Sequence, residues 1–389
     1  MNGFTFYNPT KILFGEGQIE HVGEETASIG KNVLFLTGGG SVKKAGLYDK
    51  VLALLAKAGC RVTEKSGIAP NPEIDSVREG AKLCRKEKID VILAIGGGSV
   101  IDAAKAIAAG AIYDGDPWDF FDKKGSVDKP LKIGAVLTLS ATGSEANGNT
   151  VVTNPETEEK RATYHPGLYP SFSILDPTLT FSVPREQTAY GAVDILSHVF
   201  EQYFHNVANT PLQDGAAEAI MRTVIDCAPV AMEEPDNYNA RAQLMWASTL
   251  ALNGLLSSGI TRGDWACHIM GHEFSAKYGL AHGASLSIMF PSWMKYVFKA
   301  NPERFAQFSK NVWGVDISSL SVEEAAIAGI GATKDFFHNT LGLGVSLSDH
   351  GIDGSRIEEM TDSATKHAAL GSFVPLSRED VVNIYQSAL

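Results

Sequence analysis

The stretch Asp90-Val-Ile-Leu-Ala-Ile95, which runs directly into Gly96-Gly-Gly-Ser99, decides the fold. A short apolar run bounded by a charged residue and a glycine turn is typical of a strand buried on both faces. The residues after the turn, Val100 to about Ala109, are predicted to form a helix. A strand that passes through a glycine turn into a helix is the repeating unit of an α/β fold.

The same succession occurs once before and continues afterwards. Asn32-Val-Leu-Phe-Leu-Thr37 is a second predicted buried strand, and a glycine turn and a helix from about Tyr48 to Ala58 follow it. Further strands are predicted at Ile133 to Leu139 and at Ser173 to Leu175. This repetition predicts a parallel sheet with helices on both faces.

The pattern changes after Pro184, which suits the first position of a helix. From there apolar residues recur at helical spacing and strand-like runs nearly vanish, as in Val193, Leu196, Phe200 and Tyr203. We therefore expect an α/β domain over residues 1–182 and an all-helical domain over residues 183–389.

Composition excludes several classes of protein. A hydrophobic content of 44% is that of a folded globular chain. The chain has 33 Lys and Arg against 45 Asp and Glu, and its net charge of -12 disfavours nucleic acid and anionic membranes as partners. Its four cysteines form no C-x-x-C pair, so neither a disulfide framework nor a zinc knuckle is predicted.

No membrane or export signal is predicted either. Met1 is followed by polar residues, without the basic flank and apolar core of a signal peptide. The most apolar window, residues 91–113, contains Asp102 and Lys105, which argues against a membrane span. We expect a cytoplasmic protein.

Two polar turns are candidate binding sites for a nucleotide. Gly96 to Ser99 lies where a strand feeds a helix, and the N–H groups of a first helical turn favour phosphate. Ser99 and Asp102 also have the spacing of a capping pair. The small hydroxyls of Thr138, Thr142 and Ser144 follow a predicted strand, as in a binding crevice. Alone, each turn is equally compatible with ordinary loop chemistry, because neither is a G-x-G-x-x-G or P-loop motif.

Histidines and one aspartate have the spacing of a metal site. Asp194 and His198 lie four residues apart and so share a helix face, as do His268 and His272. His282 follows the helix break that we expect at Gly279. A binding role explains an aspartate in an otherwise apolar helix. Imidazole and carboxylate ligands without thiolate suit Fe²⁺, Zn²⁺, Co²⁺ or Ni²⁺, and spacing does not choose among these ions.

These features together resemble the iron-containing alcohol dehydrogenase family over nearly the whole chain. The motifs that carry the resemblance occur in family order: Phe6-Tyr-Asn-Pro-Thr-Lys-Ile-Leu-Phe-Gly15, Gly96-Gly-Gly-Ser-Val-Ile-Asp102, Thr142-Gly-Ser-Glu145, Leu175-Asp-Pro177, Asp194-x-x-x-His198, His268-x-x-x-His272 and His282-Gly283. Asp264-Trp-Ala-Cys-His268 is similar to the branch of butanol dehydrogenases and NADPH-dependent aldehyde reductases.

The resemblance implies a Rossmann-like N-terminal dinucleotide-binding domain and an all-α C-terminal metal-binding domain. It implies that the metal ligands are Asp194, His198, His268 and His282. The residue matching His272 lies near the nicotinamide and is not a ligand, which changes the pairing that spacing alone suggested. We expect His272 to carry the alcohol proton toward solvent.

The cofactor contacts that we expect are Gly38, Gly39, Gly40, Ser41, Gly96, Gly97, Gly98, Ser99, Asp102, Thr138, Thr142, Ser144 and Lys160. NAD-specific sites place an acid against the ribose 2′-hydroxyl. Here no acid follows the strand at Asn32 to Thr37 before Asp49, and Lys43 and Lys44 add positive charge. The sequence therefore predicts that NADP(H) is used at least as well as NAD(H).

The expected activity is hydride transfer between NAD(P)H and small aliphatic alcohols or aldehydes, in a homodimer that holds one divalent metal per chain. One alternative is a glycerol or polyol dehydrogenase of the related branch. Another is a metal-binding protein without catalysis, which the glycine and hydroxyl turns argue against. A nicotinamide fluorescence titration separates this last alternative from the enzymes.

Overall fold

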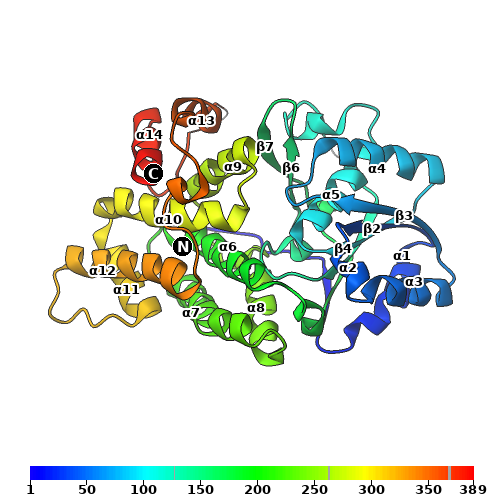
Figure 1. Ribbon diagram of the computed structural model, residues 1–389, viewed down its shortest axis with the longest axis horizontal. Helices are drawn as coiled ribbons and strands as arrows, with labels where there is room; N and C mark the ends of the chain where they lie inside the picture. The colour runs from blue at the N-terminus through cyan, green and yellow to red at the C-terminus, as the bar shows by residue number, and fades with distance from the viewer. Residues whose placement is uncertain (127, 262, 367–368) are drawn as a thin grey trace. The chain divides into compact units, whose positions relative to one another are not determined.

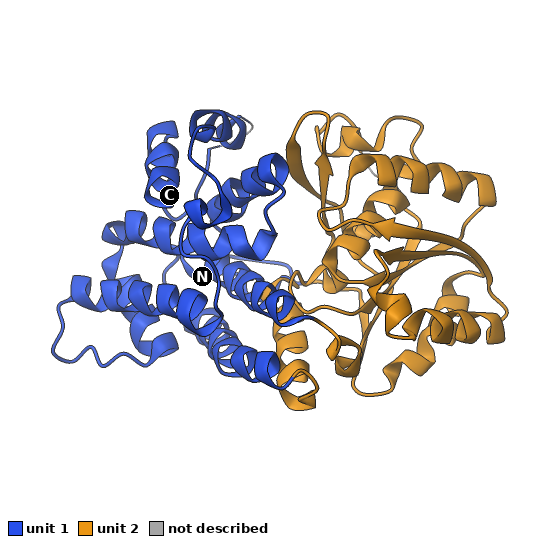
Figure 2. Cartoon of the chain, viewed as in Figure 1, with its two compact units in different colours: residues 1–6, 184–234, 254–389 blue, residues 7–183, 235–253 orange. Residues whose placement is uncertain are grey.

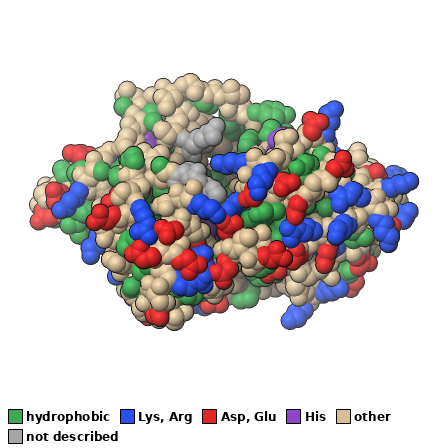
Figure 3. Space-filling view, turned by 90° about the horizontal axis from the view of Figure 1, so that it is seen from above, with side chains coloured by type: hydrophobic (Ala, Val, Ile, Leu, Met, Phe, Trp, Pro, Cys, Tyr) green, Lys and Arg blue, Asp and Glu red, His purple; other side chains and the backbone are tan. Residues whose placement is uncertain are grey.

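The computed structural model describes residues 1–389 except 127, 262 and 367–368. The chain divides into two compact units, which Figure 2 shows in separate colours. Unit 1 comprises residues 1–6, 184–234 and 254–389, and unit 2 comprises residues 7–183 and 235–253. Acidic and basic side chains are mixed over the face drawn in Figure 3.

Unit 2 contains a six-stranded sheet in the order β1-β8-β5-β4-β2-β3, with every neighbouring pair parallel. Its strands are β1 (Lys11–Phe14), β2 (Asn32–Gly38), β3 (Arg61–Ile68), β4 (Val91–Gly96), β5 (Lys132–Leu137) and β8 (Phe172–Leu175). The predicted parallel sheet is confirmed, and with it the two buried strands that the apolar runs indicated.

Helices cover both faces of this sheet (Figure 1). Successive side chains of a strand point to opposite faces. Val33 and Phe35 of β2 accordingly pack with α1 (Val22–Ile29) and α3 (Leu47–Lys57). On the other face, strand residues that include Leu34 and Leu36 pack with α4 (Ile74–Glu87) and α5 (Gly98–Gly110). Burial on both sides explains why β2 and β4 are continuous apolar runs.

Three strands of unit 2 escaped prediction because they are polar. The edge strand β3 exposes Arg61 and carries Glu64 and Lys65, so it shows no apolar run. The hairpin of β6 (Asn149–Asn154) and β7 (Glu159–Tyr164) is rich in Asn, Thr and charged residues. Partly solvated strands of this kind lack the signal by which buried strands are recognised.

The helix α8 (Tyr238–Ala251) lies in unit 2, although the sequence grouped it with the helical region. Met245 belongs to the core beneath the sheet. The Thr249 hydroxyl donates to Oε1 of Glu145 at 2.6 Å, and the Trp246 ring meets Phe14 edge-on. Helical periodicity identifies an apolar face but not its partner.

Unit 1 is helical. Among the described residues after 184, the only β-structure is an isolated bridge between Leu370 and Leu376. Pro184, which was predicted at the first helical position, is instead the N-cap of α6, and the helix begins one residue later at Arg185. The helices are α6 (Arg185–Tyr203), α7 (Pro211–Glu233), α9 (Ala266–Tyr278), α10 (His282–Val297), α11 (Pro302–Trp313), α12 (Val322–Asp335), α13 (Ile357–Thr365) and α14 (Arg378–Ser387). None of the described helices is long and apolar enough to cross a bilayer.

The helix α6 is central to unit 1, since every residue from Gly191 to Tyr203 is buried. A helix buried on all sides is surrounded by others. Its C-terminal end enters an aromatic core in which Phe204 stacks on Phe305 with ring centroids 4.4 Å apart. Any polar side chain on α6 therefore lies away from bulk water and needs a specific partner.

Two glycines of α12 should respond oppositely to alanine. A Cβ at Gly329 would lie 2.0 Å from Oγ of Ser309 on α11, whereas one at Gly331 would meet nothing within 4 Å. Gly329→Ala should lower the free energy of unfolding by about 1–3 kcal/mol through overpacking. Gly331→Ala should raise it by up to about 1 kcal/mol through helix propensity. Urea unfolding of both variants checks this, and equal signs would contradict it.

Candidate metal centre and cofactor site

The buried helix α6 carries the first two residues of the candidate metal centre. Asp194 and His198 are one helical turn apart, and both side chains are buried. Oδ1 of Asp194 lies 3.8 Å from Nδ1 of His198. The spacing in the sequence is thus realised as one face of one helix.

Two further histidines, His268 and His282, lie at the starts of α9 and α10. The left-handed residue Gly279, with φ of 67°, ends α9, and α10 begins three residues later at His282. A Cβ at Gly283 would lie 2.6 Å from Cα of Tyr190, so the start of α10 packs directly on the backbone of α6. This close approach brings His282 to Asp194.

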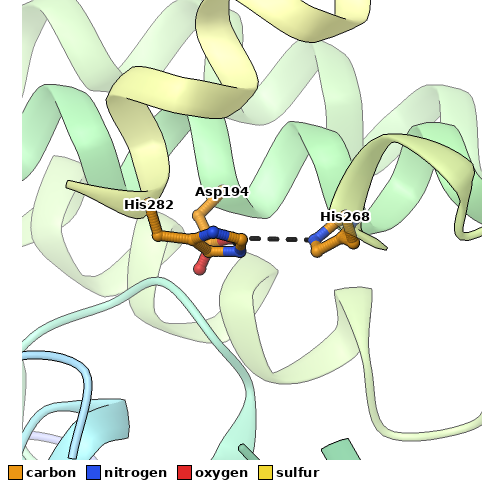
Figure 4. A group of neighbouring side chains, drawn as sticks. All are labelled: Asp194, His268 and His282. Atoms are coloured by element: carbon orange, nitrogen blue, oxygen red, sulfur yellow. Dashed lines mark ion pairs between the residues drawn. The ribbon is translucent and has the colours of Figure 1, made fainter. Parts of the chain in front are cut away.

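Figure 4 shows the side chains of Asp194, His268 and His282 together. Oδ1 of Asp194 is 3.9 Å from Nε2 of His268 and 3.6 Å from Nε2 of His282. One donor atom from each of the three residues lies within 4.8 Å of the other two. His198 stands beside this trio, with its ring stacked on that of His268 at a centroid distance of 4.7 Å.

The donor set fits a divalent metal. Oδ1 of Asp194 is buried and accepts no hydrogen bond from a described residue, although three imidazole nitrogens lie 3.6, 3.8 and 3.9 Å away. Two donors on one tetrahedral ion, each about 2.0–2.2 Å from it, lie about 3.3–3.6 Å apart. The observed separations exceed hydrogen-bond length and leave room for such an ion.

His272 lies one turn after His268 on α9. It is half-buried, and its ring centroid is 5.4 Å from that of His282. Neither His272 nor His198 is one of the three residues whose donor atoms converge. His198 is nevertheless close to the carboxylate, since its Nδ1 lies 3.8 Å from Oδ1 of Asp194. His272 contacts the trio through the ring of His282.

Glu201 adds a carboxylate that sequence reasoning missed. It lies seven residues after Asp194, and its Oε1 is 2.8 Å from Nδ1 of His268. Burial raises the pKa of Glu201 to about 8. Burial, together with the charge of Glu201, also raises the pKa of the nearby Asp264 to about 7. The sequence signal for Glu201 was its spacing, because residues 194, 198 and 201 lie on one face of a helix.

In unit 2 both glycine turns lie at the point where the strand order reverses. β2 and β4 are neighbours, with Thr37 opposite Ile95, but β3 lies on one side of this pair and β5 on the other. Ligands of open α/β sheets bind at such a switch point, beyond the carboxyl ends of the strands. The turns that begin at Gly38 and Gly96 follow these two strand ends.

The first turn requires glycine at one position and leaves open space at another. Gly40 adopts φ of 119°, a conformation that L side chains rarely adopt, and it is the N-cap of the short helix α2 (Ser41–Lys44). A Cβ at Gly39 would meet nothing within 4 Å. The space next to Cα of Gly39 is thus open to a ligand, and the nearby Ser41 is exposed.

The second turn packs against the hydroxyl cluster. A Cβ at Gly98 would lie 2.4 Å from Oγ1 of Thr142, and the Thr138 N–H donates to the Gly96 carbonyl at 3.0 Å. The structure thus brings together the two polar turns that the sequence singled out separately. Absence of a side chain at Gly98 is required by this packing whether or not a phosphate binds.

Asp102 does not act as part of the predicted capping pair with Ser99. The N-cap of α5 is Gly97, and no side chain caps this helix. Asp102 instead accepts hydrogen bonds from the Ser144 hydroxyl at 2.5 Å and from the Val151 N–H at 3.0 Å. Its side chain therefore ties α5 to the Thr142–Ser144 turn and to β6.

Lys160 and Lys105 supply positive charge around Asp102. Lys160 on β7 donates to Oδ1 of Asn71 at 2.8 Å. Burial raises the pKa of Asp102, and the charges of Lys105 and Lys160 oppose that rise. Both lysines thus favour the ionised carboxylate of Asp102.

Lys105, which the sequence analysis used only against a membrane span, is fully buried. Its ammonium donates to Oγ of Ser144 at 2.8 Å, Oδ1 of Asn147 at 3.1 Å and the Asn149 carbonyl at 2.8 Å. Burial lowers the pKa of Lys105 to about 8. The sequence signal for this network was the pair Asp102 and Lys105 within a run of apolar residues.

The stability of the protein should therefore carry a pH dependence that Lys105→Met removes. With a folded-state pKa of about 8 against the ordinary 10.5, the unfolded chain binds more protons between these pH values. Stability from this group rises with pH in that window. The melting temperature of wild type minus that of Lys105→Met should increase from pH 7 to pH 10. A constant difference, as expected for the exposed Lys86→Met control, would contradict the assignment.

Comparison with known proteins identifies the family of the chain. A family profile described as iron-containing alcohol dehydrogenase matches residues 9–177, and one for the C-terminal part of the Fe-containing alcohol dehydrogenase family matches residues 188–389. The chain is 46% identical over 389 residues to the probable NADH-dependent butanol dehydrogenase 1 of Bacillus subtilis, with all of both chains covered.

Two other relatives span the full chain. The NADPH-dependent aldehyde reductase YqhD of Escherichia coli is 39% identical over 393 residues, covering 100% of both. A crystal structure of NADH-dependent butanol dehydrogenase A from Thermotoga maritima superposes with a TM-score of 0.96 at 45% identity, covering 100% of this chain and 99% of that one. The chain belongs to the iron-containing alcohol dehydrogenase family and is an NAD(P)-dependent oxidoreductase.

Proposed function

We propose that the protein reduces small aliphatic aldehydes, and oxidises the corresponding alcohols such as butanol, with NAD(P)H and one divalent metal. The observation that carries this proposal is the convergence of one carboxylate and three imidazoles on a buried site within unit 1. The relatives at 42–47% identity are named butanol dehydrogenases. A 1,3-propanediol dehydrogenase of Klebsiella pneumoniae is only 32% identical, which makes a polyol substrate the weaker alternative.

Four side chains would hold the metal: Asp194, His198, His268 and His282. A bound Fe²⁺ or Zn²⁺, or Co²⁺ or Ni²⁺ in its place, supplies a Lewis acid for the substrate oxygen. Asp194 contributes the only negative charge of this set, and the histidines bind as neutral imidazoles. The imidazole of His272, half-buried beside His282, accepts the alcohol proton and passes it toward solvent.

The dinucleotide would bind to unit 2 at the two glycine turns. The first-turn N–H groups of α5 lack partners within the helix and suit the pyrophosphate. The network of Lys105, Ser144 and Asp102 holds the neighbouring turn in place. The proposed contacts are Gly38, Gly39, Gly40, Ser41, Gly96, Gly97, Gly98, Ser99, Asp102, Thr138, Thr142, Ser144 and Lys160.

Metal content separates the proposed ligands from the proposed proton carrier. His198→Ala and His282→Ala should lose bound metal and activity, because the remaining ligands hold a labile ion poorly. His272→Ala should keep its metal while turnover falls by about 10²–10⁴-fold. Elemental analysis of purified variants and steady-state kinetics measure both quantities. Metal loss in His272→Ala equal to that in His268→Ala would show that the two residues of α9 are the ligands.

Cofactor choice tests the glycine turn after β2. Wild type should use NADPH at least as well as NADH, since no acid there repels the 2′-phosphate. Gly39→Asp should selectively lower kcat/KM for NADPH, because its side chain has open space and adds negative charge beside the ribose. Gly39→Asn is the control of equal size without charge. A tenfold preference of wild type for NADH, about 1.4 kcal/mol, would contradict the proposal.

We also propose that two chains form a homodimer through the N-terminal segment. Met1, Phe4 and Phe6 are strongly exposed, and β1 is an edge strand of its sheet. Exposed aromatic side chains and strand edges are typical of association surfaces. Light scattering after gel filtration should give twice the mass of the chain. The double variant Phe4→Ser/Phe6→Ser should have a lower mass. The control variant Leu212→Ser, which changes another exposed residue, should keep the mass of wild type. A monomeric wild type at micromolar concentration would contradict the proposal.

A further inference from the structure

Glu201 continues the face of α6 that carries the metal candidates. It follows His198 by three residues and Asp194 by seven, which places all three on one side of the helix. Its side chain is among the most buried of the charged groups, at 1% exposure. A carboxylate buried to this degree costs free energy unless specific donors surround it.

The donors around Glu201 come from the start of α9. Oε1 accepts the backbone N–H of His268 at 3.0 Å and lies 2.8 Å from Nδ1 of the same residue. Oε2 accepts the backbone N–H of Trp265 at 2.5 Å. One carboxylate thus contacts both the backbone and the ring of a proposed metal ligand.

The backbone contacts cap α9 from another helix. The N-cap residue, Trp265, has φ of 62° and provides no capping side chain. The first N–H groups of a helix need acceptors from outside. Glu201 serves Trp265 and His268, and Oδ1 of Asp264 serves Ala266 at 3.2 Å. The contact of Glu201 with the His268 N–H fixes the position of this third residue of α9 directly, whereas Asp264 contacts only Ala266 in this helix.

The ring contact determines which nitrogen of His268 is available. A carboxylate accepts a hydrogen bond from Nδ1–H, and the neutral ring then carries its lone pair on Nε2. Nε2 is the atom that points to Oδ1 of Asp194, 3.9 Å away. A carboxylate behind a ligand imidazole holds the ring orientation and raises its basicity.

We infer that Glu201 is a positioning residue of the metal centre, which holds the His268 ring in the Nδ1–H tautomer with Nε2 directed at the ion. The inference rests on the proposed function, because it requires His268 to be a ligand. A purely structural cap would need only the two backbone contacts. The ring contact is the additional feature, and metal affinity is the property that it should control.

Asp264 offers a matched control. It is also a buried acid of this region, and its Oδ2 accepts backbone N–H groups of Ser372 at 2.7 Å and Phe373 at 2.8 Å. Asp264 thus accepts hydrogen bonds from three backbone N–H groups, those of Ala266, Ser372 and Phe373. Asp264→Asn therefore perturbs a buried carboxylate of the same neighbourhood without changing the contact with the His268 ring.

The test measures Zn²⁺ affinity of the full-length protein by competition with a chromogenic chelator. The melting temperature of each metal-free variant is recorded in parallel. Glu201→Gln should weaken Zn²⁺ binding by about 10–100-fold, the usual effect of losing such a partner. Asp264→Asn should lower the melting temperature and leave Zn²⁺ affinity within about twofold of wild type. A loss below tenfold in Glu201→Gln, or an equal loss in Asp264→Asn, overturns the inference.

Two further measurements complete the design. Asp194→Asn serves as the ligand reference: if it binds Zn²⁺ as tightly as wild type, the proposed metal centre is wrong and the role of Glu201 falls with it. If Glu201→Gln does not fold, proton NMR of wild type decides. Wild type should show a downfield imidazole N–H proton that disappears in His268→Gln. Its absence from wild type overturns the inference.

Discussion

The burial of the Asp194 carboxylate is the constraint on which unit 1 depends. It lies on a helix that is enclosed from Gly191 to Tyr203, so bulk water does not solvate its charge. A buried charge persists only where compensating groups converge on it. Three histidine nitrogens within 3.9 Å provide that convergence, and two of them belong to other helices. The packing of α9 and α10 on α6 is therefore part of the site.

Local features show how this packing is enforced. Gly283 allows α10 to touch the backbone of α6, and Gly279 ends α9 in a left-handed conformation. Glu201 fixes the start of α9 through hydrogen bonds that span 64 and 67 residues of sequence. Because metal ligands must be preassembled and deprotonated, such a site couples ion binding to the folding of unit 1.

The parts of the fold that sequence predicted are those with local signals. β2 and β4 are apolar runs because both faces of the sheet are covered, and Asp194 and His198 share a face because helices repeat every 3.6 residues. The polar strand β3 and the placement of α8 with the sheet have no such signal. Lys105 and Glu201 were missed for a related reason: their partners lie 39 to 67 residues away.

The glycine turns differ in what their sequence and their position in the sheet each indicate about a ligand. Gly98 must lack a side chain because Thr142 occupies that space, and Gly96 because Val100 does. The G-G-G-S pattern after β4 is therefore explained by the packing of the chain itself and does not require a phosphate. The position of the turn in the sheet is what favours a dinucleotide. This turn and the one after β2 both lie at the point where the strand order reverses. In the turn after β2, the space beside Gly39 is open. That juxtaposition arises from sheet topology, which neither motif specifies alone.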